Sequence, residues 1–223
     1  TAKVSLKYAG EIAKIIKSWK APVYIVPGNH DIYGYNIDTI DQTMLGMFYK
    51  ANVVNLLTRK KPLSLRFKSA GETFTISIEG QEYYDSIDTG KSDDYQVFNT
   101  SSDLKILVSH SMLLEKQFVP GIAHTLIKDV ITDADIVLSG HYHPGFDDIK
   151  LNGTRFFNPG SALRVEASAH NKTVEPRCLI LDFHADSQKT GIDYDWEYYS
   201  FQTAKPGNEI FDFNTKQVTQ QTN

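Results

Sequence analysis

Three short apolar runs in this 223-residue chain are each followed directly by a polar cluster that contains histidine. The runs are residues 23–26, 104–108 and 135–138, and runs of this length between turn residues are typical of buried strands. The clusters are residues 28–31 (Gly-Asn-His-Asp), 109–110 (Ser-His) and 140–143 (Gly-His-Tyr-His). In an open α/β sheet, ligands gather at the carboxyl ends of the strands. The pattern therefore predicts an α/β fold in which three loops meet at one polar site.

Helical patterns occupy much of the chain before residue 50. The first helix is predicted from apolar residues at helical spacing, which we expect to form its buried face: Tyr8, Ile12, Ile15 and Trp19, with Ala9 and Ile16 widening the stripe. Pro22 ends this helix, and Asp38 is expected to cap a second one. A helix followed by the apolar run 23–26 indicates a parallel sheet with this run as a central strand.

The middle of the chain has strand and loop patterns. Alternating apolar residues at 63–67 and 74–78 predict two half-buried strands, antiparallel to each other. Residues 89–103 are rich in turn formers and predict a surface loop. A short helix is expected around residues 122–130, and the Asn152-Gly153 pair predicts a tight hairpin. The polar residues 214–223 predict a frayed tail.

Composition excludes several classes of protein. Hydrophobic residues make up 41% of the chain, which is enough for a globular core. The net charge of −4 offers no basic surface dedicated to nucleic acid or membrane. No apolar run reaches the length of a membrane span, and no signal peptide is visible. The single cysteine, Cys178, cannot form an internal disulfide, so we expect a reducing, cytoplasmic location.

The side chains of the three clusters have the chemistry of metal ligands. Imidazole suits Zn, Fe, Mn or Ni, and an amide oxygen such as that of Asn29 suits the harder of these ions. A lone histidine such as His110 is more often a hydrogen-bonded structural residue. His141 and His143 would share one face of a strand, whereas in a tight turn they can diverge toward two neighbouring metals. Because all three clusters follow strands, a metal site is the favoured interpretation.

These clusters resemble the last three signature motifs of the calcineurin-like metallophosphoesterases. Residues 158–161 (Asn-Pro-Gly-Ser) also resemble the loop that backs the metal centre in that family. The resemblance spans about residues 23–165 and implies a four-layer α/β/β/α sandwich that holds two divalent metal ions. It assigns Asn29, His110 and His141 to one metal and His143 to the other. It also places His30 near the leaving group as a general acid, with Asp31 orienting it.

Two earlier motifs of the family, Asp-x-His and Gly-Asp-x-x-Asp, have no counterpart here. In the family they supply further ligands of the first metal and the aspartate that bridges both metals. The 27 residues before Gly28 contain no aspartate and no histidine. We therefore expect the chain to lack the N-terminal strand–helix–strand portion, which a second chain could supply. Residues 1–203 are expected to form the phosphoesterase domain, and residues 204–223 an extension or tail.

The residues that make up these motifs are most similar to those of SbcD-type DNA repair nucleases and their phage relatives. This resemblance implies a manganese-dependent exo- or endonuclease, with DNA as substrate and an SMC-like ATPase as a partner. Two alternatives remain open. The chain could be a phosphodiesterase or phosphatase for small substrates, or a non-catalytic fragment that needs a partner chain to complete its site. A DNA duplex and bis-p-nitrophenyl phosphate as substrates separate the first two hypotheses.

Several residues outside the clusters are weaker candidates. Arg164 could bind a substrate phosphate, although a surface role is favoured. Structural or surface roles are favoured for three further histidines: His124, His170 and His184. The aromatic face formed by Tyr194, Trp196 and Tyr198 could stack nucleobases, but packing is the favoured interpretation. The basic run Arg59, Lys60 and Lys61 is expected to be a solvated turn rather than a phosphate contact.

Overall fold

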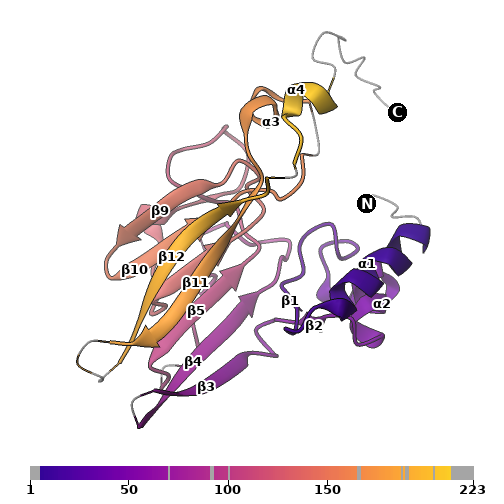
Figure 1. Cartoon of the computed structure of the whole chain (residues 1–223). Helices are drawn as coiled ribbons and strands as arrows, with labels where there is room; N and C mark the ends of the chain where they lie inside the picture. Colours follow the sequence, from indigo (N-terminus) through magenta and orange to yellow (C-terminus); the bar gives the residue numbers. More distant parts are fainter. Residues whose placement is uncertain are drawn as a thin grey trace.

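The chain forms a mixed α/β fold around a central mixed sheet (Figure 1), which confirms the predicted fold class. The computed structural model describes residues 6–69, 71–90, 93–99, 101–164, 167–186, 188, 191–202 and 204–211. The predicted tail from residue 214 onward lies outside these described residues. None of the helices in the described ranges has the length and hydropathy needed to cross a bilayer.

Six strands form the central sheet. Their order across the sheet is β3 (Leu63–Ser69), β4 (Glu72–Gln81), β5 (Leu104–Ser109), β8 (Ile136–Ser139), β10 (Thr154–Asn158) and β9 (Phe146–Leu151). The four inner strands run parallel, and the edge strands β3 and β9 run antiparallel to their neighbours. The alternating segments 63–67 and 74–78 therefore pair as predicted. Asn152 and Gly153 both adopt left-handed backbone angles, which confirms the tight hairpin between β9 and β10.

A second β layer covers one face of this sheet. The hairpin β11 (Arg177–Ala185) and β12 (Ile192–Ser200) lies across the inner strands (Figure 1). Its inward side chains pack on a buried cluster from the central sheet: Ile76, Leu104, Ile106, Ile136 and Phe157. The Trp196 ring meets the Phe157 ring edge to face, with 5.3 Å between centroids. Tyr194, Trp196 and Tyr198 all belong to this packed face, so packing is confirmed over nucleobase stacking.

The opposite face of the sheet is covered by segments that the sequence patterns misassigned. Residues 89–103 are not only a surface loop, because Tyr95 and Val97 are 3% and 4% exposed and pack against the sheet. The helix expected at 122–130 is also wrong. In its place, β7 (Thr125–Leu126) pairs with β6 (Leu113–Leu114), and a single 3₁₀ turn follows at η2 (Ile127–Asp129). Pairing with β6 holds Thr125 extended and leaves too few residues for a helix.

A smaller α/β unit lies beside the central sheet (Figure 1). It contains α1 (Leu6–Ser18), β1 (Tyr24–Ile25), η1 (Ile37–Gln42), α2 (Met44–Lys50) and β2 (Asn55–Leu56). Asp38 does not cap a helix. Instead, the Asn36 side chain accepts from the Asp38 N–H at the start of η1, and Thr43 caps α2 by accepting from the Gly46 N–H. Both caps leave the Asp38 carboxylate uninvolved.

The strand β1 is not central. It pairs in parallel with β2, and no other strand of the described residues pairs with it. Tyr24 is exposed and Ile25 is half-buried. The parallel direction agrees with the prediction, but the position in the sheet does not. One edge of β1 is therefore left without a strand in the described part of the chain.

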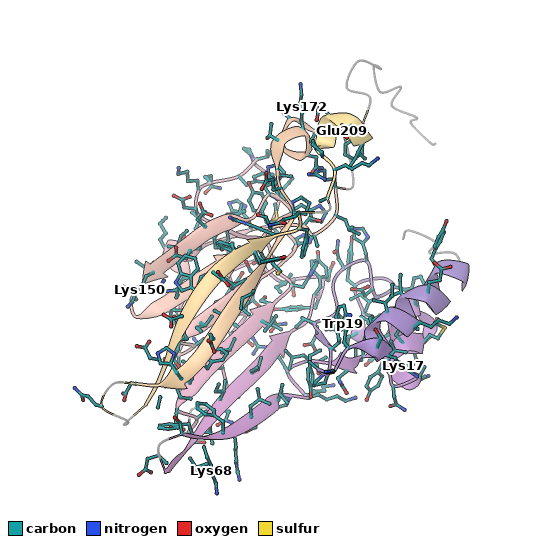
Figure 2. All side chains as sticks on the ribbon, viewed as in Figure 1. Lys17, Trp19, Lys68, Lys150, Lys172 and Glu209 are labelled. Atoms are coloured by element: carbon teal, nitrogen blue, oxygen red, sulfur yellow. The ribbon has the colours of Figure 1, made fainter. Side chains whose placement is uncertain are left out.

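The helix α1 buries one edge of the predicted stripe and not its centre. The four residues at the centre are 39–57% exposed: Tyr8, Ile12, Ile15 and Trp19. Figure 2 labels Trp19 just beyond the carboxyl end of this helix. Ala9 and Ile16, which were expected to widen the stripe, pack on the cluster of α2 and β2 together with Ala13. Ala9 is buried and the other two are half-buried. Two small alanines allow the helix axis to approach its neighbours closely, so this edge of the stripe faces the core.

Two short helices lie close together at one end of the molecule. They are α3 (Ala169–Thr173) and α4 (Gly207–Ile210), and Figure 2 labels Lys172 and Glu209 on them. A Cβ at Gly207 would lie 1.9 Å from the carbonyl oxygen of Asn171. Residues 207–210 are therefore packed against α3.

Candidate metal centre

Backbone hydrogen bonds bring the three histidine clusters to one edge of the fold. The Tyr83 N–H donates to the carbonyl of Pro27, at a distance of 3.0 Å, and so ties the loop after β1 to the end of β4. The His110 N–H donates to the carbonyl of Gln81, and the Gly140 N–H donates to the carbonyl of Ser109. The loops after β1, β5 and β8 are consequently neighbours. The predicted meeting of the clusters at the carboxyl ends of strands agrees with this geometry.

Three potential ligand side chains converge at this edge. The Nε2 atom of His110 lies 3.2 Å from the Oδ1 atom of Asn29. The rings of His110 and His141 lie 5.0 Å apart between centroids. His141 has a left-handed φ of 67°, which is unusual for a residue with a side chain and is typical of functional sites. One amide oxygen and two imidazoles fit a divalent cation of the Mn, Fe, Ni or Zn group.

Burial favours the neutral form of His110 and His141, which is the form that binds metals. Burial lowers the pKa of His110 to about 4, with smaller contributions from His141, His143 and His30. Burial also lowers the pKa of His141, although the Asp88 carboxylate opposes this effect. Because a metal competes with a proton for the same nitrogen, a low pKa favours metal binding near neutral pH.

The remaining predicted site residues surround this centre. His30 and His143 are exposed, and both lie near enough to influence the pKa of His110. The Asp31 carboxylate accepts a hydrogen bond from the Gly28 N–H, at 3.0 Å, and closes the 28–31 turn. Among the described contacts, no hydrogen bond joins Asp31 to His30. Asp31 therefore shapes the loop that presents Asn29, and orientation of His30 by Asp31 remains a prediction.

The loop 158–161 supports the loop that carries His141 and His143. The buried Asn158 side chain donates from Nδ2 to the carbonyl of Tyr142, at 3.0 Å. Its Oδ1 atom accepts from the Gly160 N–H, and the Ser161 N–H donates to the carbonyl of His143. These bonds fix the backbone from which both histidines project.

Motif reasoning missed two kinds of residue at the site. The Tyr83 ring lies 5.5 Å from the His141 ring and 6.1 Å from the His110 ring, and the Tyr35 ring packs on Tyr83. Tyr83 follows the end of β4, so its position after a parallel strand could have indicated it. The second is the buried Asp88, which no motif marks.

Asp88 anchors the segment that follows His110. Its carboxylate accepts from the Met112 N–H at 2.6 Å, and from the Thr125 and Tyr95 hydroxyls at 2.7 Å. These three donors occupy both of its oxygens. Among the described residues, no group of three His, Cys, Asp or Glu side chains could hold a metal ion. The donor set at this edge therefore depends on the Asn29 amide, and it fits one cation.

The weaker candidates lie away from these contacts. Arg164 donates to the carbonyl of Val174 and lines a cavity of about 360 Å³ beside α3 and α4, with no cluster residue in its lining. The His124 Nδ1 atom forms a hydrogen bond with the carbonyl of Ile122. The His184 Nδ1 atom lies 3.9 Å from the Oδ2 atom of Asp195. His170 lies within α3.

The basic run is a turn, as predicted, but two of its three side chains bind other parts of the protein. Arg59 bonds to the Gln81 side chain and to the carbonyl of Asp93. Lys61 donates to the Tyr49 hydroxyl. Lys60 is exposed. The run therefore contributes mainly to internal contacts.

Comparison with known proteins agrees with this geometry. Residues 6–186 match the calcineurin-like phosphoesterase superfamily domain, which is most of the chain. The protein therefore belongs to the calcineurin-like phosphoesterase superfamily, whose members generally use divalent metal ions to hydrolyse phosphoesters. A search of curated proteins finds no significant match to this chain.

Gly28 allows close approach of the His110 ring, which leads to a prediction. A Cβ at Gly28 would lie 2.7–2.9 Å from three atoms of that ring. Gly28→Ala should therefore displace His110 and weaken Mn²⁺ binding by about 10-fold or more, as measured by calorimetric titration. Gly10→Ala is the matched control, because the exposed Gly10 in α1 has no atom within 4 Å of its would-be Cβ. It should leave metal affinity unchanged; equal affinities in both variants would contradict the placement of His110.

The low pKa of His110 predicts acid sensitivity of the metal-free protein. The unfolded chain takes up this proton near pH 6.5, whereas the folded protein takes it up only near pH 4. Stability is therefore full above about pH 6.5 and falls as the pH drops toward 4. For this group the loss between pH 7.5 and 4.5 is about 2–3 kcal/mol. Urea unfolding at both pH values should show a loss smaller by this amount in His110→Asn; equal losses would refute the burial of a neutral imidazole.

Proposed function

We propose that this protein is a metal-dependent phosphodiesterase and, more specifically, a nuclease of the SbcD type that acts on DNA. The observation that carries the general proposal is the convergence of Asn29, His110 and His141 in the neighbouring loops that follow β1, β5 and β8. The nuclease assignment is supported by the resemblance of the motif residues to those of SbcD-type nucleases. Manganese is the metal that this assignment favours, and the mixed amide and imidazole donors suit it.

The residues of this chain have distinct roles in the proposed reaction. Asn29, His110 and His141 would hold the cation, and Asn158 and Asp88 would keep their loops in place. The bound cation would supply positive charge for the phosphate oxygens and lower the pKa of a coordinated water. His30 is exposed beside the site and, when protonated, can donate its proton to the departing oxygen.

We propose that a second metal site, with His143 as one ligand, is completed from outside these 223 residues. Two observations support an additional segment or a partner chain. One edge of β1 has no strand beside it in the described structure, and the adjacent helix α1 exposes apolar side chains. A strand and a helix placed there would cover both. An SMC-like ATPase is a further proposed partner, and it rests on the SbcD resemblance alone.

Metal content and substrate choice test this proposal together. The purified chain is loaded with Mn²⁺ and desalted, and its manganese is counted by elemental mass spectrometry. Hydrolysis of bis-p-nitrophenyl phosphate and of a DNA duplex is then measured with and without Mn²⁺. We expect at least one Mn²⁺ per chain and metal-dependent cleavage of both substrates. Cleavage of the small ester alone would overturn the nuclease assignment and favour a small-substrate phosphodiesterase. Absence of metal binding would overturn the whole proposal for this chain alone.

A further inference from the structure

A row of aromatic rings leads away from the metal centre to the surface. The ring centroids of Tyr35 and Tyr83 lie 5.4 Å apart, and those of Tyr83 and His141 lie 5.5 Å apart. Tyr35 is 47% exposed, whereas Tyr83 is half-buried beneath it. The row therefore connects the ligand histidines with an aromatic surface open to solvent.

The backbone at Tyr35 is held in an unfavourable conformation. Residues 33–36 form a tight turn, in which the Asn36 N–H donates to the carbonyl of Tyr33. Gly34 and Tyr35 both have left-handed φ values, of 55° and 56°. Glycine adopts this conformation freely, but a tyrosine does so only at a cost. Because Tyr35 stays half-exposed, burial in the core does not explain why it occupies this position.

We propose that the Tyr35 ring, supported by Tyr83 at an angle of 61° between the ring planes, forms a stacking platform for the nucleobase of a nucleotide whose phosphate lies at the metal centre. This inference rests on the proposed function and narrows its substrate class to nucleotide esters. An aromatic ring accepts the face of any nucleobase, and loss of one such contact weakens binding by about 5- to 150-fold.

Chemistry on the platform favours a base over a charged group. Tyr35 contributes a phenol ring, and burial raises the pKa of the Tyr83 hydroxyl, which the Asp88 and Asp85 carboxylates raise further. The two tyrosines therefore offer aromatic rings rather than a cation, and binding of the ligand's phosphate is left to the metal centre.

Tyr35→Gly tests the platform because it removes the ring and also suits the left-handed backbone. Two esters with the same leaving group are compared in Mn²⁺: thymidine 5′-(p-nitrophenyl phosphate) and methyl p-nitrophenyl phosphate. The ratio of their kcat/KM values should fall at least about 5-fold in Tyr35→Gly. Tyr33→Ala is the matched control, since Tyr33 is a similarly exposed tyrosine of the same turn. It should keep the wild-type ratio; an unchanged ratio in Tyr35→Gly would overturn the platform.

A binding measurement separates failure of the platform from failure of the proposed function. Saturation-transfer NMR detects contact between the protein and the base protons of thymidine 5′-monophosphate without any turnover. We expect these signals in the wild type and in Tyr33→Ala, and their loss in Tyr35→Gly. Contact with the base protons but no hydrolysis of any ester would refute the proposed activity and support the platform. Hydrolysis without contact to the base protons would support the activity and refute the platform.

The same NMR experiment distinguishes two sources of the base. A short single-stranded oligothymidylate is compared with the mononucleotide in competition. Tighter binding of the oligonucleotide indicates that the platform receives the end of a strand. Equal binding indicates that it receives a free nucleotide. Either result supports the platform if the base-proton signals are lost in Tyr35→Gly, and signals that persist in this variant would refute it.

Discussion

Replacement of His141 by alanine is expected to abolish metal binding and phosphoester hydrolysis. His141 supplies one of three potential ligands and lies 5.0 Å, between ring centroids, from His110. Loss of a residue that only orients a metal ligand typically weakens binding by about 10- to 100-fold, so we expect removal of a ligand itself to weaken it by more than about 100-fold. Manganese content after desalting and the initial rate with bis-p-nitrophenyl phosphate would measure both effects.

A matched histidine outside the site provides the control for His141→Ala. His184 is exposed on β11, and its ring lies 3.9 Å from the Asp195 carboxylate. His184→Ala should retain wild-type metal content and rate. Circular dichroism would establish that both variants are folded. Unchanged hydrolysis in a folded His141→Ala protein would refute the assignment of the metal centre.

Of the substitutions proposed for this protein, Phe157→Ala is expected to cause the largest loss in the free energy of unfolding. Phe157 has 0% exposure and lies between the central sheet and the β11–β12 hairpin, where its ring contacts Trp196. Truncation of a buried phenylalanine leaves a cavity and costs about 3–5 kcal/mol. Urea denaturation, with unfolding followed by tryptophan fluorescence, would measure this loss.

Phe98 offers the matched control for Phe157. It is 64% exposed, and its described ring contact is with the Arg59 guanidinium, 5.0 Å from the ring centroid. Phe98→Ala should therefore cost less than about 1 kcal/mol, the value of an exposed cation–π contact. If the two variants lost similar stability, the packing of two β layers on each other would be contradicted.

The inner strands of the central sheet and the meeting of the histidine clusters could be predicted from local sequence because both follow simple patterns. The runs 104–108 and 135–138 became β5 and β8, since a short, mainly apolar run between turns suits a strand buried on both faces. The topology of a parallel sheet was enough to bring together the clusters after β5 and β8. The cluster after β1 joins them through the hydrogen bond from the Tyr83 N–H to the carbonyl of Pro27, because β1 lies outside the central sheet. The convergence of Asn29, His110 and His141 was thus available before any coordinates.

The local sequence pattern could not show which face of a helix is buried. In α1, large apolar residues formed the centre of the predicted stripe, and Ala9 and Ile16 lay at its edge. The structure buries Ala9, half-buries Ala13 and Ile16, and exposes the large residues. Hydrophobicity favours Ile12 and Ile15, but close packing against α2 and β2 favours small side chains. Only the neighbouring elements determine which of these effects prevails.

By itself, the sequence determined the α/β class and most strands of the central sheet, and it predicted which side chains could serve as metal ligands. These depend on periodicity and residue type, which are local properties. Only the tertiary structure decided that Tyr95 is buried, that Asp88 anchors the loop after His110, and that Tyr35 and Tyr83 lie beside the metal centre. Each of these depends on contacts between segments far apart in the chain, and no local pattern records which distant segment will be the partner.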